Sequence, residues 1–407
     1  MKTKPRILFL MHSASQNGAT ILLLHLLQWL KGAVDWEIEV VVQGSGPLLG
    51  EIRSAARTTV WRSPSSLLPA CLRNRMTGLR SNLETQCLKA LLAGRRFDLI
   101  YANTVAVWPL VKALSNRAPA LLWHIHELGY ALRLIIGSQP PCELLCASRF
   151  IAVSNSVREA LSHEFNVPDD KVDLVHGFVP ILDLNLEEQR LRRERVRKSL
   201  GWPADAFVVG GCGTLGWRKG TDLFLQIARA VRNTKGYEKM RFLWVGGGVQ
   251  DQEVLEFTYD LQTLGLQERC CRVPTTTNVS DYYAAMDVLA LTSREDPFPL
   301  VMLEAGSHGV PTVCFANSGG ATEFVGEDAG LIAPYLDIAA FAAHLMRLQD
   351  MPTLREQLGI AASTKVRTNY SIEVQAPKLL KIIEHCLPTE EKPIGAAVRE
   401  ASRFASR

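Results

Sequence analysis

The sequence predicts an α/β protein built from two doubly wound parallel-sheet domains that face each other across a cleft. Short apolar strands alternate with helical patterns, which is typical of a parallel sheet with helices on both faces. This alternation occurs twice along the chain. A chain of 407 residues, 47% of them hydrophobic, is long enough for two such domains and apolar enough for their cores.

The N-terminal domain is expected over residues 1–182. Its first apolar run follows basic residues, as the core of a signal peptide does, but it is too short for one and His12 follows at once. A buried strand is therefore predicted there, followed by a helix over Thr20–Leu30. The predicted strands are Ile7–Met11, Glu37–Val42, Asp98–Tyr101, Ala120–Ile125, Phe150–Val153 and Val172–Val175.

The C-terminal domain is expected over residues 183–368. Near its start, the charged run Glu187–Arg195 interleaves acids with arginines, which predicts a solvated helix near the hinge. Residues 369–387 contain a helix that we expect to pack back on the N-terminal domain, and the polar tail 388–407 is expected to be disordered. The predicted strands are Phe207–Gly210, Arg241–Val245, Cys270–Val273, Val288–Leu291, Thr312–Phe315 and Gly330–Ala333, and the last helices are Ile338–Leu348, Leu354–Val366 and Ser371–Cys386.

The composition excludes several classes of function. Lys and Arg number 45 against 41 Asp and Glu, so the surface is not basic enough for a dedicated nucleic-acid binder. Nine cysteines without a C-x-x-C pair indicate a reducing cytoplasm and favour buried apolar residues over metal ligands. No run approaches the roughly twenty apolar residues of a membrane span, so any membrane contact is peripheral.

One segment, Leu67–Gly94, is apolar and basic at once. It is either an ordinary surface helix with solvated cations or an interfacial helix that rests on anionic lipid at the inner membrane face.

The stretch Gly210–Gly220, GGCGTLGWRKG, spells a dinucleotide-binding turn. Its context is wrong, because the next helix is predicted to begin near Thr221 and the next strand ends in glycines where the ribose-binding acid should stand. The stretch therefore suits a bare diphosphate better than a nicotinamide cofactor. Arg218 and Lys219 would neutralise its charge, unless they are simply solvated.

In parallel sheets, ligands bind beyond the carboxyl ends of the strands. The loop Ser13–Ala19 follows the first strand and has small residues at a helix N-terminus. After another strand, alternation puts His124 and His126 on one face, followed by Glu127. That trio fits a zinc site, a histidine oriented by the acid, or a structural histidine.

The stretch Ser293–Ala305 is the most informative, because a strand ends in charge and a helix starts near Pro299. Glu304 lies inside that helix among apolar residues, where burial would leave it without a partner. A ligand rich in hydroxyl groups would supply one. Helix capping by Asp296 and an internal hydrogen bond of Glu304 are the structural alternatives.

These residues, in this order, resemble the retaining glycosyltransferases of family 4, which have the GT-B fold of two facing Rossmann-like domains. The likeness extends from Ile7 to about Leu387. The residues that carry it are Asn17–Gly18, His126–Glu127, Ile151–Val157, Lys219–Gly220, Gly246–Gly248, Asp287, the pair Asp296 and Glu304 with seven residues between them, and Ser318–Gly320 with Glu323.

The resemblance implies an acceptor-side N-terminal domain, a donor-side C-terminal domain and roles for individual residues. The implied catalytic residues are His126, Arg218, Lys219 and Asp296. The implied donor-binding residues are Gly18, Gly213, Thr214, Gly247, Phe298, Pro299, Leu300, Val301 and Glu304.

Two positions depart from the family pattern. Asp296 stands where the family usually has Glu, and Thr214 replaces the usual arginine, whose charge Arg218 would supply. We expect Lys219→Ala and Glu304→Ala to abolish a donor-induced thermal shift while leaving the melting temperature of the unliganded protein nearly unchanged.

The resemblance implies a retaining hexosyltransferase of polysaccharide biosynthesis. Its partners would be a nucleotide-sugar donor of unknown base and a surface glycan or lipid-linked oligosaccharide acceptor, with no other cofactor. The sequence has no Asp-x-Asp triplet, and the family likewise works without a metal ion. The alternative is a catalytically silent GT-B scaffold in a polysaccharide-assembly complex. Nucleotide-sugar epimerases, phosphorylases and nicotinamide dehydrogenases are further rivals that the fold class alone does not exclude.

Overall fold

The structure is a computed structural model that describes residues 4–61, 86–88, 90–92, 94–137, 144, 146–182, 185–248 and 251–388. Most of the segment 67–94 and the tail after residue 388 lie outside the described residues, so the expectations for them stay predictions. The chain divides into two compact units, one within Met1–His176 and Gln375–Arg407 and the other within Gly177–Val374.

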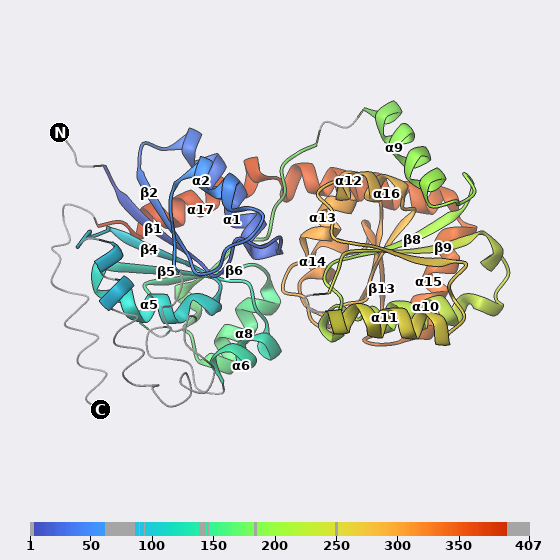
Figure 1. Ribbon diagram of the computed structural model, residues 1–407, viewed down its shortest axis with the longest axis horizontal. Coiled ribbons are helices and arrows are strands. Elements are labelled where there is room, and N and C mark those ends of the chain that lie inside the picture. The colour runs from blue at the N-terminus through green and yellow to red at the C-terminus, as the bar shows by residue number, and fades with distance from the viewer. Residues whose placement is uncertain are drawn as a thin grey trace. The chain divides into compact units, whose positions relative to one another are not determined.

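The first unit is a doubly wound α/β domain. Its sheet has the strand order β3-β2-β1-β4-β5-β6-β7, and all of its strand pairs are parallel. Helices α1 and α2 lie on one face of the sheet, and α5, α6 and α8 lie on the other (Figure 1). The strands are β1 (Arg6–Met11), β2 (Glu37–Val42), β3 (Arg57–Val60), β4 (Leu99–Asn103), β5 (Ala120–Ile125), β6 (Arg149–Ala152) and β7 (Val172–Leu174), and the helices are α1 (Gly18–Ala33), α2 (Leu49–Ala55), α5 (Trp108–Leu114), α6 (Gly129–Ile136) and α8 (Asn155–Phe165).

The second unit repeats this plan with the parallel strand order β10-β9-β8-β11-β12-β13. Helices α10, α11 and α15 cover one face of its sheet, and α12, α13 and α16 cover the other (Figure 1). The strands are β8 (Phe207–Cys212), β9 (Met240–Val245), β10 (Cys270–Val273), β11 (Val288–Leu291), β12 (Thr312–Phe315) and β13 (Gly330–Ala333). The helices are α9 (Leu186–Ser199), α10 (Thr221–Ala230), α11 (Asp251–Thr263), α12 (Val279–Ala285), α13 (Leu300–Ser307), α14 (Ala321–Val325), α15 (Ile338–Asp350) and α16 (Pro352–Asn369).

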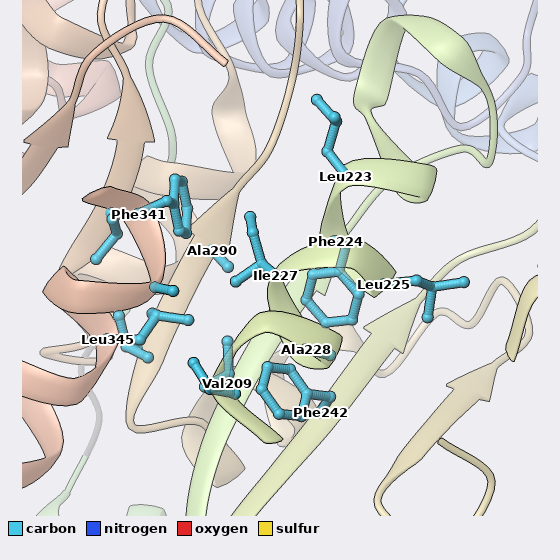
Figure 2. Packing of buried hydrophobic residues seen from close by; sticks show 14 of the residues in the cluster. Val209, Leu223, Phe224, Leu225, Ile227, Ala228, Phe242, Ala290, Phe341 and Leu345 are labelled. Atoms are coloured by element: carbon cyan, nitrogen blue, oxygen red, sulfur yellow. The ribbon is translucent and has the colours of Figure 1, made fainter. Parts of the chain in front are cut away.

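The core of the second unit lies between its sheet and the helices α10 and α15. Buried residues of β8 and β11, such as Val209 and Ala290, meet Phe224 and Ile227 of α10, and Phe341 comes from α15 (Figure 2). These positions alternate along the strands and recur at helical spacing along α10, which is why the sequence pattern predicted both kinds of element. The core therefore fixes the carboxyl ends of β8 and β11, where the candidate site lies.

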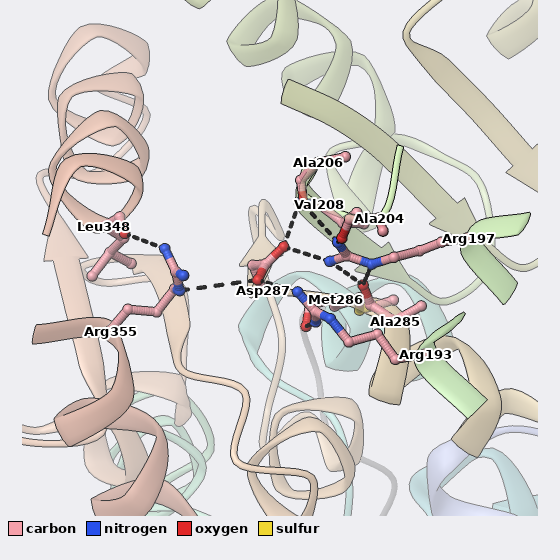
Figure 3. A network of polar contacts seen from close by, with 10 residues as sticks. All are labelled: Arg193, Arg197, Ala204, Ala206, Val208, Ala285, Met286, Asp287, Leu348 and Arg355. Carbon is pink, nitrogen blue, oxygen red and sulfur yellow. Dashed lines mark hydrogen bonds and ion pairs between the residues drawn. The ribbon is translucent and has the colours of Figure 1, made fainter. Parts of the chain in front are cut away.

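Helix α9 is exposed over most of the charged run Glu187–Arg195, as the sequence predicted, but an arginine just beyond that run is buried. The Arg197 side chain is only 2% exposed and makes five hydrogen bonds, four to backbone carbonyls and one to the Asp287 carboxylate (Figure 3). Asp287 also accepts a hydrogen bond from Arg193 and one from the backbone N–H of Val208. Burial lowers the pKa of Arg197, and the Asp287 charge opposes that effect. Arg193, in the charged run, and Arg197, just beyond it, therefore anchor α9 to the start of β8.

Helix α17 (Ile372–Cys386) links the two units along the chain. Its first residues, up to Val374, belong to the second unit, and the residues from Gln375 on belong to the first. Ala376, Leu379 and Ile383 have no exposed surface. The chain passes from the first unit to the second after residue 176 and returns to the first after residue 374. The sequence had suggested domain limits at residues 182 and 368.

Candidate active site

The turn after β8 carries the predicted diphosphate cations. A short 3-10 turn spans Trp217–Lys219 and ends at Gly220, and α10 begins at Thr221, as the sequence predicted. Gly220 has a positive φ of 64°, and a Cβ there would lie 2.0 Å from the Thr292 carbonyl oxygen. Glycine is therefore required at this position for its backbone conformation and for close approach to the loop after β11.

The loop after β11 brings the predicted acid to these cations. Lys219 Nζ donates to Asp296 Oδ2 at 2.5 Å, and Arg218 Nη1 lies 3.9 Å from Asp296 Oδ1. Arg218 also donates to the Glu295 carbonyl oxygen at 2.9 Å. The structure thus brings together the three catalytic residues that the sequence predicted in this half of the chain.

Asp296 is held by its backbone as well as by its side chain. Its N–H donates to the Ser318 carbonyl oxygen at 2.7 Å, and it forms a parallel bridge with Gly319. Burial favours the neutral carboxyl, but the charges of Lys219 and Arg218 lower the pKa of Asp296 below its ordinary value. An ionised acid therefore neutralises part of the cationic charge at this turn.

Glu304 has a partner that the sequence analysis did not name. The Tyr283 hydroxyl of α12 donates to Glu304 Oε2 at 2.6 Å. Burial raises the pKa of Glu304, while the Tyr283 hydrogen bond and the Lys219 charge act in the opposite direction. Cys212, at the end of β8, is half-buried. Burial, followed by the Glu304 charge, raises the pKa of Cys212 to about 12, so this thiol stays protonated.

The predicted donor-binding glycines lie against the same turn. A Cβ on Gly213 would lie 3.3 Å from the Lys219 Cε atom, and one on Gly246 would lie 2.0 Å from the Gly213 carbonyl oxygen. Gly247 adjoins Thr275, whose Oγ1 would be 3.1 Å from an added Cβ. Thr214, in the position of the family arginine, is exposed. The glycines therefore let the two loops and the lysine side chain pack closely together.

The stretch from Phe298 to Val301 forms the start of α13, with Pro299 as its N-cap. The Phe298 ring is 7% exposed and lies 5.6 Å from the Tyr370 ring, and Leu300 is also 7% exposed. Val301 is half-buried. Because the side chains of Phe298 and Leu300 belong to the protein interior, backbone amides are the groups of this stretch that can serve a ligand.

The predicted residues of the first unit also lie near one another. Gly18 begins α1, which Asn17 caps through a hydrogen bond from the Thr20 N–H. Asn103, at the end of β4, donates to the Ala19 carbonyl oxygen and bonds His126 Nε2 at 3.0 Å. One amide side chain therefore connects the Gly18 loop to His126.

The contacts of His124 and His126 bear on the three interpretations of this histidine pair. The His124 and His126 rings lie on one face, with centroids 4.1 Å apart, as the alternation predicted. His124 Nδ1 bonds the Tyr101 hydroxyl at 2.6 Å, and Glu127 accepts hydrogen bonds from the backbone N–H groups of His126 and Val105. Burial, followed by the effect of His12, lowers the pKa of His126 to about 3. These contacts match a neutral histidine held by protein groups.

The described residues contain neither a cluster suited to a metal ion nor a helix suited to a membrane. They contain no group of three His, Cys, Asp or Glu side chains placed to hold a metal ion. None of the helices in the described ranges is both long enough and apolar enough to cross a bilayer.

Two known protein families match the two doubly wound units of the chain. The sequence profile described as Glycosyltransferase Family 4 matches residues 16–181, and the profile described as Glycosyl transferases group 1 matches residues 206–350. The chain belongs to the GT-B glycosyltransferases. Each profile covers one of the two doubly wound units, so the resemblance inferred from the sequence is confirmed at the level of family and fold.

Two curated relatives show partial similarity to this GT-B glycosyltransferase. The lipopolysaccharide core biosynthesis glycosyltransferase LpsD of Rhizobium meliloti is 33% identical over 175 residues, which are 43% of this chain and 48% of that protein. D-inositol 3-phosphate glycosyltransferase 1 of Catenulispora acidiphila is 28% identical over 254 residues, 58% of this chain and 60% of that protein. The chain thus spans about half the length of the first relative and three fifths of the second.

The similarity to a solved structure covers nearly the whole of this chain. The crystal structure of Anabaena HepE in complex with UDP-glucose matches with a TM-score of 0.75, covering 93% of this chain and 99% of that chain. The two sequences are 20% identical, so this match shows a common fold.

Sequence reasoning missed two residues of the candidate site in this glycosyltransferase. Tyr283 lies between the predicted strands Cys270–Val273 and Val288–Leu291, and no local pattern indicates that its hydroxyl reaches Glu304. Asn103 follows the predicted strand Asp98–Tyr101 by two residues, and this position was the one available signal, because polar side chains at carboxyl strand ends favour a site. Asp287, by contrast, carries the family resemblance but is bound by Arg197 and Arg193, which is a structural role.

Proposed function

We propose that this glycosyltransferase transfers a hexosyl group from a nucleotide sugar to a hydroxyl group of a surface glycan or lipid-linked oligosaccharide. The proposal includes retention of the anomeric configuration and independence of a metal ion. The observation that carries it is the cluster of Arg218, Lys219 and Asp296, with Glu304 nearby. Arg218 and Lys219 lie in the loop after β8, Asp296 lies in the loop after β11, and Glu304 lies in the second turn of the following helix α13.

The donor diphosphate is proposed to bind at Arg218 and Lys219. Both are cationic, and Lys219 is held beside the buried Asp296, so its charge is fixed in position before a ligand arrives. Preorganised charge of this kind stabilises a leaving group more than mobile, solvated charge does. The departing nucleoside diphosphate is where negative charge develops in the reaction, and protein cations supply the compensation that a metal ion gives elsewhere.

The nucleotide ribose is proposed to bind Glu304. A carboxylate accepts hydrogen bonds from hydroxyl groups, and Tyr283 already fixes one of its oxygens. The HepE complex with UDP-glucose makes UDP the first nucleotide to try.

In the proposed transfer, the bond between the anomeric carbon and the diphosphate oxygen breaks, and the acceptor oxygen forms its bond on the same face of the sugar. The acceptor proton leaves with the departing phosphate oxygen, so atoms and charge balance without a protein nucleophile. Asp296 would orient sugar hydroxyls, and the same role is proposed separately for His126 within the first unit. The neutral state of His126 suits this role, because a neutral imidazole both donates and accepts a hydrogen bond.

The acceptor is proposed to be a glycan because the relative LpsD is named for lipopolysaccharide core biosynthesis. Peripheral contact with a membrane surface would bring such an acceptor within reach. The segment Leu67–Gly94 is the proposed contact, on its sequence pattern alone.

The decisive experiment is a thermal-shift screen with UDP, GDP and ADP sugars, followed by measurement of nucleoside diphosphate release. We expect one nucleotide class to raise the melting temperature and the matching sugar donor to be turned over when a glycan acceptor is added. NAD serves as the negative control. If no nucleotide sugar shifted the melting temperature, the proposal would be wrong.

The rival scaffold function predicts a different pattern. A silent GT-B module would release no nucleoside diphosphate with any donor, whether or not it bound one. Thr214 and Asp296 motivate this rival, because both depart from the family pattern. Restoring the family residues in Thr214→Arg and Asp296→Glu would raise activity in a weak enzyme and leave a scaffold inactive.

A further inference from the structure

Trp217 is an unusually exposed tryptophan for its position beside the candidate site. All eight tryptophans of the chain lie within the described ranges, and Trp217 is the only one that is exposed, at 55% of its surface. The other seven are buried or half-buried. A large aromatic side chain in water forgoes a substantial hydrophobic gain, so its exposure at a fixed place needs a reason.

The indole is held in place by an arginine from a different loop. The Arg294 guanidinium carbon lies 5.2 Å from the centre of the Trp217 ring, and Arg294 Nη1 donates to the Trp217 carbonyl oxygen at 2.8 Å. Arg294 is itself fixed by two hydrogen bonds to the Asp222 carboxylate, at 2.8 and 2.7 Å. The paired charges leave a rigid and electrically balanced support under the ring.

A second exposed aromatic residue lies beside the same arginine. Tyr335, which follows β13, is 44% exposed and donates its hydroxyl to the Arg294 carbonyl oxygen at 3.2 Å. Trp217, Arg294 and Tyr335 thus come from the loops after β8, β11 and β13, all at the carboxyl edge of the sheet. We call these three residues the aromatic platform.

We propose that the aromatic platform is a stacking site for an uncharged pyranose ring of the glycan acceptor. Pyranose rings have one face lined with C–H groups, which stacks on an aromatic ring, and a rim of hydroxyl groups that needs polar partners. The platform offers both kinds of group, because Trp217 and Tyr335 provide the rings while the Tyr335 hydroxyl and the Asp222 carboxylate provide the polar partners. Since Arg294 is paired with Asp222, the platform favours a neutral sugar over an anion.

The platform adjoins the proposed donor site without sharing its residues. The N–H of Arg294 donates to the Arg218 carbonyl oxygen at 2.9 Å, so Arg294 of the platform contacts the loop after β8, which carries both Trp217 and the diphosphate cations. The donor has partners of its own in Lys219 and Glu304. A sugar on the platform is therefore a second sugar, which we assign to the glycan acceptor although the platform lies in the unit expected to bind the donor. That part of the inference rests on the proposed function.

The test measures sugar binding directly, without the reaction. Saturation-transfer NMR would be recorded with methyl α-glycosides of glucose, galactose and mannose and with N-acetylglucosamine, on protein saturated with UDP. We expect transfer to the ring protons of at least one sugar, and about tenfold weaker binding in Trp217→Ala. Trp217→Phe, which keeps a ring and guards against a folding defect, should retain most of the binding. Tyr259→Ala, which removes an exposed tyrosine (66%) from α11, is the matched control and should bind as the parent does.

The outcomes of the saturation-transfer experiment separate the sugar site from the proposed function. No transfer in the parent, or equal transfer in Trp217→Ala and the parent, overturns the platform. If UDP-glucose in place of UDP displaces the bound sugar, the platform takes the donor sugar, and the acceptor assignment is wrong. If the sugar binds but UDP does not, the proposed transferase function fails while the sugar site stands.

Discussion

The Tyr283 hydroxyl donates a 2.6 Å hydrogen bond to the Glu304 carboxylate across the gap between helices α12 and α13. Tyr283 is 1% exposed, so water does not compete for this bond. The contact answers the question that the sequence raised about an acid among apolar residues. Glu304 has a protein partner, and that partner leaves the carboxylate with further lone pairs for a ligand.

Tyr283→Phe should weaken UDP binding about tenfold, which corresponds to about 1.4 kcal/mol. Loss of the hydrogen bond frees the carboxylate to rotate and raises the pKa of Glu304 further, since the Tyr283 bond lowers it. The acid limb of the affinity profile should therefore move to higher pH. Isothermal titration calorimetry with UDP between pH 5 and pH 9 would measure both effects. Tyr282→Phe, on the same helix, is the control, and matching profiles for the two variants would contradict the positioning role.

Glu304→Gln should abolish ribose binding yet stabilise the unliganded protein at high pH. Burial raises the folded-state pKa of Glu304 above its ordinary value, so the folded state binds this proton more tightly than the unfolded state does. The stabilising protonation is complete below about pH 4 and is lost as the pH rises through the folded pKa. The melting temperature of the variant should thus equal that of the parent near pH 4 and exceed it at pH 8. Glu256→Gln, an exposed site on α11, should show no such crossover.

Lys219→Met should destabilise the protein by about 3 kcal/mol, because the buried Asp296 loses its partner. The sequence alone had suggested that removal of Lys219 would leave the melting temperature nearly unchanged. The prediction differs here because the 2.5 Å ion pair between Lys219 and Asp296 could not be inferred from the sequence. Urea unfolding at pH 8 measures the loss. The double variant Lys219→Met/Asp296→Asn should recover most of the stability but not the binding of UDP. A double variant that bound UDP as the parent does would exclude Lys219 from the donor site.

Arg197→Met should destabilise the protein by about 3 to 5 kcal/mol, because it leaves Asp287 and several carbonyl groups buried without their donor. Arg197→Lys should recover little, since an ammonium group cannot reproduce the five hydrogen bonds of the guanidinium fork. Arg195→Met, whose side chain is 71% exposed, should change stability by less than about 0.5 kcal/mol. Urea unfolding of the three variants is the measurement, and equal midpoints for Arg197→Met and Arg195→Met would contradict the anchoring role.

Strands with a buried apolar core could be predicted closely from the sequence. The predicted strands Cys270–Val273 and Thr312–Phe315 coincide with β10 and β12. Strand β3, Arg57–Val60, was missed because it pairs only with β2 at the edge of the sheet and its residues are at most half-buried. An edge strand of this kind carries no apolar run to recognise.

The candidate site could be predicted as a set of residues but not as a set of contacts. Strand ends and glycine turns indicated Lys219, Asp296 and Glu304, because parallel strands bring their carboxyl ends to one edge. The partners of these residues are 77 positions away for Lys219 and 21 for Glu304, and no local pattern encodes such a pairing. For the same reason, the sequence did not indicate that Arg197, just beyond the exposed charged run of α9, is buried.

The sequence by itself determined the order of the elements, the two doubly wound sheets and the family, because side-chain periodicity and turn residues act over a few neighbouring positions. Only the tertiary structure decided that Asp296 neutralises Lys219, that Tyr283 holds Glu304 and that Arg294 supports Trp217. Those pairings depend on the packing of helices and loops from distant parts of the chain, which brings each donor within bonding distance of its acceptor.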